Sequence, residues 1–86
     1  MPTVDGWQPA PDAHSWARKI FNRHFADLPH LVLAGAFRRQ RLALLITSHG
    51  LSREDVIRIA QCARLHALQI KIYPADCQIH VLLYLP

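Results

Sequence analysis

The chain alternates two stretches of helical periodicity with two pairs of short apolar runs. From Asp12 to Leu28 apolar side chains recur every three or four positions, which predicts an amphipathic helix that Asp12 caps and Pro29 ends. A second helix is predicted to begin after Ser52, with Asp55 at the capping-box position. Its inward face is expected to carry Val56, Ile59, Ala60, Ala63 and Ala67.

Each predicted helix precedes two runs that are typical of strands. Residues 31–37 and 42–47 flank a charged turn, and residues 68–73 and 78–85 flank a type I turn at Tyr73-Pro74-Ala75-Asp76. The element order is therefore α-β-β-α-β-β. It predicts an α+β two-layer sandwich, with both helices packed on one face of a mostly antiparallel four-stranded sheet.

Length and composition favour a single domain. A chain of 86 residues suits one core, which we assign to residues 12–86, whereas the prolines of residues 1–11 predict an extended N-terminal arm. With 51% hydrophobic and 19% charged residues, the chain is too apolar for a disordered segment and too charged for a membrane span. The two cysteines and the lack of a leader pattern indicate a reduced, cytoplasmic protein without a membrane partner.

One face of the predicted sheet should be left without helices. It carries the alternate residues of the last two strands, namely Lys71, Tyr73, His80, Leu82 and Tyr84. We expect this face to form a homodimer interface, because apolar and aromatic residues concentrate in interface cores. The alternative is a platform on which single-stranded nucleic acid stacks.

The middle of the chain is basic. Residues 18–71 hold all ten Lys and Arg but only three Asp and Glu, within a net charge of +4. An anion-binding surface would be built from Arg38, Arg39, Arg41, Arg18 and Arg23. Its partner would be a nucleic acid or an acidic protein, whereas the alternative is a set of scattered, solvated arginines.

Cysteine and histidine recur with a spacing that resembles zinc ligands. Cys62 with His66 and Cys77 with His80 form a C-x3-H…C-x2-H set. Cys77 and His80, three apart, would point to opposite faces of a regular strand, so buried or inert thiols are the expected outcome. We therefore predict no metal and no other cofactor, and a melting temperature that a chelator leaves unchanged.

Catalysis has little support in the sequence. His49, in the loop before the second helix, is the candidate general base, and no nucleophile pattern accompanies it. The sequence thus predicts a small non-enzymatic binding module that is homo-oligomeric through its open sheet face. The alternative is a nucleic-acid-binding accessory protein that uses the arginines and the Tyr, His and Lys of that face.

Overall fold

The computed structural model describes residues 8–9, 11–38 and 41–86. Most of the predicted N-terminal arm, together with Arg39, lies outside the described residues. The elements are β1 (Gln8–Pro9), α1 (Pro11–Phe25), β2 (Val32–Arg38), β3 (Leu42–Ser48), α2 (Arg53–Leu65), β4 (Gln69–Ala75) and β5 (Gln78–Tyr84). None of the described helices is long and apolar enough to cross a membrane.

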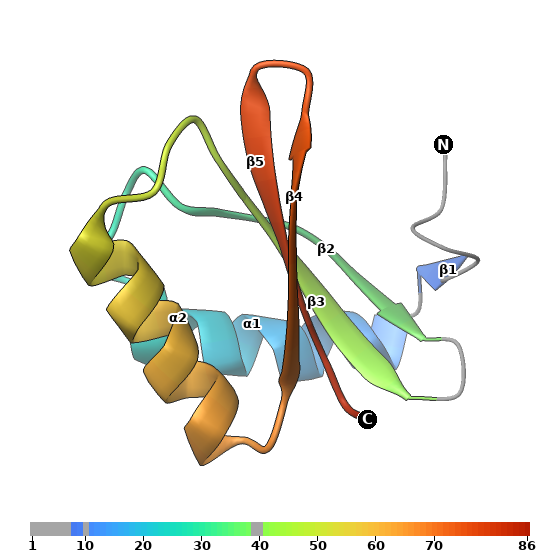
Figure 1. Ribbon diagram of the computed structural model, residues 1–86. Coiled ribbons are helices and arrows are strands. Elements are labelled where there is room, and N and C mark those ends of the chain that lie inside the picture. The colour runs from blue at the N-terminus through green and yellow to red at the C-terminus, as the bar shows by residue number, and fades with distance from the viewer. Residues whose placement is uncertain (1–7, 10, 39–40) are drawn as a thin grey trace.

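The predicted α+β fold is confirmed. The described strands form one antiparallel sheet in the order β1-β2-β3-β5-β4, so the short β1 extends the four-stranded sheet at the outer edge of β2. Helix α1 contacts β2 and β3, and α2 lies beside α1 (Figure 1). The helices share one layer, because residues from both belong to a single core cluster with one face of the sheet.

Strand register places alternate residues on the two faces as predicted. Val81 and Leu83 are fully buried in the cluster that includes the helices. Leu82 lies between them in sequence and belongs to a second cluster on the other face. The predicted alternation in the last hairpin is therefore confirmed.

Helix α1 begins and ends earlier than predicted. Pro11 occupies the first helical position, where its missing N–H costs no hydrogen bond, so Asp12 lies in the first turn instead of capping it. The helix ends at Phe25, whose carbonyl accepts from the Leu28 amide at 3.0 Å. Leu28 thus lies in the turn that follows α1 rather than inside the helix.

Both ends of α2 are held by local hydrogen bonds. The predicted capping box is present, since the Ser52 hydroxyl accepts from the Asp55 amide at 3.2 Å and the Ser52 amide donates to the Asp55 carboxylate at 2.8 Å. At the other end the Leu68 amide donates to the Ala63 carbonyl at 2.7 Å, and Ala67 has a φ of 55°. This pattern is a Schellman motif with alanine at the left-handed position.

The inward face of α2 differs from the prediction. The buried residues are Asp55, Ile59, Cys62 and Ala63. Val56 is 45% exposed, and Ala60 and Ala67 are also exposed. The Asp55 carboxylate accepts a hydrogen bond from His30, in the segment after α1, and a sequence pattern of apolar residues does not register such a polar contact.

The last turn also differs from the prediction. Ala75 pairs with Gln78, so the loop consists of Asp76 and Cys77, and Asp76 takes a positive φ of 54°. Pro74 lies inside β4 instead of starting the turn. An edge strand tolerates this proline because its missing N–H is not required on the outer side.

Candidate functional site

Several polar contacts join α2 to the end of α1 and to the segment that follows α1. Arg58 of α2 donates to Asp27 through both terminal nitrogens, at 3.1 and 2.5 Å, and to the carbonyl oxygen of His24 at 2.8 Å. His30 contacts the buried Asp55 carboxylate at 2.8 Å. These contacts fix the C-terminal turn of α1 against α2, since each joins a group near the end of α1 to a side chain of α2.

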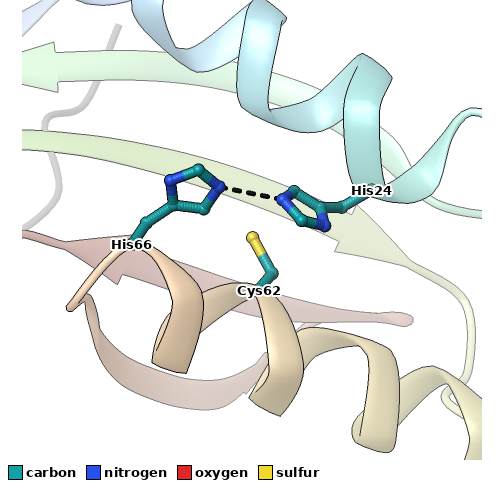
Figure 2. A group of neighbouring side chains, drawn as sticks. All are labelled: His24, Cys62 and His66. Carbon is teal, nitrogen blue, oxygen red and sulfur yellow. Dashed lines mark hydrogen bonds between the residues drawn. The ribbon is translucent and has the colours of Figure 1, made fainter.

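Three metal-ligating side chains meet at this junction. His24, Cys62 and His66, which we name the His–Cys cluster, each place a ligand atom within 4.8 Å of the other two. The Nε2 atoms of the two histidines are 2.8 Å apart and share a hydrogen bond. Figure 2 shows the Cys62 sulfur pointing toward the space between the two rings. The cluster thus converges on one point.

The local structure explains why these residues converge. Cys62 and His66 are four residues apart on α2 and its C-cap, so they lie on the same side of that helix. His24 lies in the last turn of α1, four residues after the buried Ile20 and seven after the buried Ala17. It therefore continues the buried row of α1 toward α2.

Burial favours the uncharged forms of Cys62 and His24. The Cys62 side chain is fully buried, and burial raises the pKa of its thiol to about 11. The pKa of His24 is lowered by burial first, and then by His66, Arg23 and Arg58. Cys62 is therefore a protonated thiol at neutral pH, which is a poor nucleophile.

The structure brings together only half of the cysteine and histidine set whose spacing resembles zinc ligands. Cys62 and His66 meet, but Cys77 is exposed in the β4–β5 loop, where its carbonyl accepts from His49 Nδ1 at 3.4 Å. His80 lies on the sheet face opposite the helices, with its ring 5.4 Å from that of Tyr73. His24 takes a place in the cluster that sequence spacing did not indicate.

The residues predicted for the open sheet face do share one face. Lys71 and Tyr73 pair with Leu82 and His80 across the last hairpin, and the Lys71 Nζ lies 5.9 Å from the centroid of the Tyr73 ring. Tyr73, His80 and Tyr84 are half-buried, whereas Lys71 is exposed. Three of these four side chains are therefore packed against their neighbours.

Leu82 is much less accessible than an interface residue on an open face would be. It is 1% exposed in the single chain, where it clusters with Phe37, Ala43 and Leu45. The Phe37 ring lies over Gly35, since a Cβ at Gly35 would come within 2.9 Å of that ring. Side chains of the sheet itself thus cover this patch, and a partner does not have to.

The predicted anion-binding arginines that the structure describes lie on α1, at the end of β2 and just before β3. Arg38 forms an ion pair with Asp12, and Arg18 lies 3.1 Å from the ring of His14, on its own helix. Arg23 and Arg41 are exposed, on the last turn of α1 and before β3.

No protein-family model, curated protein or solved structure matches this chain.

Proposed function

We propose that this chain is a small, non-enzymatic binding module of the cytoplasm that associates with a second copy of itself along β4. The observation that carries the proposal is the exposure of Ile70 and Ile72, which are 40% and 48% accessible on the last strand of the described sheet. Free thiols at Cys62 and Cys77 suit a reducing compartment.

These two isoleucines face the helix layer and yet remain uncovered. Ile70 pairs with Leu83, and Ile72 pairs with Val81. Directly paired residues of antiparallel strands share a face, and Leu83 and Val81 are buried under the helices. Since Ile70 and Ile72 stay exposed beside the buried Leu83 and Val81 of β5, an apolar strip runs along the outer edge of the described sheet.

A second copy is the partner that this strip fits best. An outer strand offers backbone N–H and C=O groups, except the N–H that Pro74 lacks, and two identical strands can pair antiparallel about a two-fold axis with that one hydrogen bond missing from each strand. An axis at Lys71 would oppose two like charges, which is destabilising. An axis at Ile72 instead pairs Ile72 with its counterpart and sets Lys71 opposite the Tyr73 of the other copy. We therefore place the axis at Ile72.

This interface keeps part of the surface expected from the sequence. Lys71 and Tyr73 stay in it, while Leu82 belongs to the interior of one chain. The non-enzymatic part of the proposal is supported by Cys62, whose burial and raised pKa of about 11 oppose nucleophilic chemistry.

Cross-linking tests the proposed register. In a Cys77→Ser background, Ile72→Cys should form an intermolecular disulfide under mild oxidation, because the axis brings the two substituted positions face to face. Ile57→Cys is the matched control, since Ile57 is 47% exposed but lies on α2. We expect covalent dimer from the first variant and monomer from the second. Equal cross-linking of both variants would contradict the proposed interface.

The nucleic-acid alternative predicts a different outcome. If the chain stays monomeric and binds a labelled single-stranded oligonucleotide, the logarithm of its affinity should fall linearly with the logarithm of salt concentration. Replacing Arg38, Arg39 and Arg41 together should then remove three phosphate contacts and reduce that slope by about 2. Such a result would replace self-association with nucleic-acid binding as the function of the module.

A further inference from the structure

We propose that the His–Cys cluster binds one zinc-type divalent ion through His24, Cys62 and His66, with solvent as the fourth ligand. The inference goes beyond self-association, since none of the three residues of the cluster belongs to β4, where the dimer contact is proposed. It rests on the convergence of three ligand atoms within 4.8 Å of one another.

The donor set determines which ions fit. Two imidazole nitrogens and one thiolate sulfur are borderline and soft donors, which favour zinc and cobalt over magnesium and calcium. His24 and His66 are half-buried, whereas Cys62 is fully buried. The histidine side of the cluster therefore reaches solvent, from which a fourth ligand can enter.

The spacing of the two histidine nitrogens is close to that of an occupied site, and the Cys62 sulfur lies within 4.8 Å of both. In a tetrahedral zinc site with Zn–N bonds of about 2.0–2.1 Å and a Zn–S bond of about 2.3 Å, the two nitrogens lie about 3.3 Å apart. The sulfur then lies about 3.6 Å from each nitrogen. The Nε2 atoms of His24 and His66 are 2.8 Å apart, so an entering ion has to separate them by only about 0.5 Å.

Binding exchanges protons in a defined way. The Cys62 thiol loses its proton to the buffer when the metal–sulfur bond forms. In the metal-free cluster one Nε2 carries the hydrogen that bonds to the other Nε2. That hydrogen moves through solvent to Nδ1 of the same ring, so that both Nε2 lone pairs face the ion. One proton is thus released for each ion bound.

The surrounding contacts hold the ligands in place before the ion binds. Arg58 bonds the His24 carbonyl and, through Asp27, the segment after α1. On the other side, the His66 backbone amide donates to the Cys62 carbonyl at 3.1 Å, within the Schellman end of α2. Both histidines are therefore anchored through their main chains, so the ligands can adjust by side-chain rotation.

Zinc and cobalt titrations of the full chain test the site, with matched controls on the same elements. We expect one zinc ion per chain, release of one proton by calorimetry in two buffers, and a cobalt complex with thiolate charge-transfer absorption. Cys62→Ala should abolish that absorption, and His24→Ala should weaken zinc binding by more than the 10–100-fold typical of a lost outer-shell partner. Cys77→Ser and His14→Ala, which change an exposed cysteine and an exposed histidine, should bind like the wild type.

Several results would overturn the proposal. One is the absence of stoichiometric zinc uptake by the folded wild type. Another is loss of binding in Cys77→Ser instead of Cys62→Ala, which would place the metal at the β4–β5 loop. If Cys62→Ala fails to fold, His24→Ala and His66→Ala decide the question, because these half-buried positions tolerate truncation better. Unchanged zinc affinity in both histidine variants would also refute the site.

Discussion

Replacing Ala67 with glycine should stabilise the protein. Ala67 has a φ of 55° at the Schellman end of α2 and is exposed, so the substitution removes little packing. A non-glycine residue in this left-handed region costs about 1–2 kcal/mol. Glycine in turn adds about 0.5–1 kcal/mol of entropic cost on folding. The net expectation is that the free energy of unfolding rises by roughly 0.5–1 kcal/mol and the melting temperature by roughly 2–8 °C.

Ala60→Gly is the matched control, because Ala60 is also exposed but lies within the regular part of α2. There the same change should lower the free energy of unfolding by about 1 kcal/mol and the melting temperature by about 4–8 °C. Thermal and urea unfolding followed by circular dichroism measures both variants. If Ala67→Gly destabilises as much as Ala60→Gly, α2 does not end in the left-handed turn that positions His66.

Two further predictions concern buried groups of α2. The hydrogen bond from the Ser52 amide lowers the pKa of Asp55 in the folded protein. The ionised carboxylate therefore stabilises the fold above the unfolded pKa of about 4. This stability is lost as the pH falls through the folded pKa. Asp55→Asn should lower the free energy of unfolding by about 1 kcal/mol at pH 7 and flatten the dependence of that free energy on pH below about 4. Urea unfolding at several pH values measures both effects. If the free energy of unfolding depends on acid pH as in the wild type, Asp55 does not have this role. In the presence of a chelator, Cys62→Ser should lower the free energy of unfolding by about 1–3 kcal/mol, whereas Cys77→Ser should lower it by less than about 0.5 kcal/mol. The reason is that Cys62 is buried and Cys77 is exposed. Equal unfolding midpoints for the two variants would contradict that difference in burial.

The periodic and capping signals of the sequence were sufficient for the fold. The order of elements and the capping box of Ser52 and Asp55 depend on residues close together in the chain, and both are present. The ends of α1 and the position of the last turn were misplaced. Pro11 can begin a helix as well as precede one, and Pro74 can lie in an outer strand as well as start a turn.

The candidate sites depend on contacts that local patterns do not carry. His24 is 42 residues from His66, and their contact exists only because α1 and α2 pack side by side. The one available signal was the spacing of His24 behind Ala17 and Ile20 on the buried row of α1. In the same way, the sequence placed Ile72 on the helix side but could not show that the helices leave it exposed.

Sedimentation equilibrium over a wide range of protein concentration tests self-association along β4 most directly. The wild type should approach twice the chain mass of 9.8 kDa at high concentration. Ile72→Lys should remain near 9.8 kDa, because the two-fold axis would oppose two lysines, while Ile57→Lys should behave as the wild type. A wild-type mass of one chain at every concentration, or equal masses for the two variants, would contradict this interface.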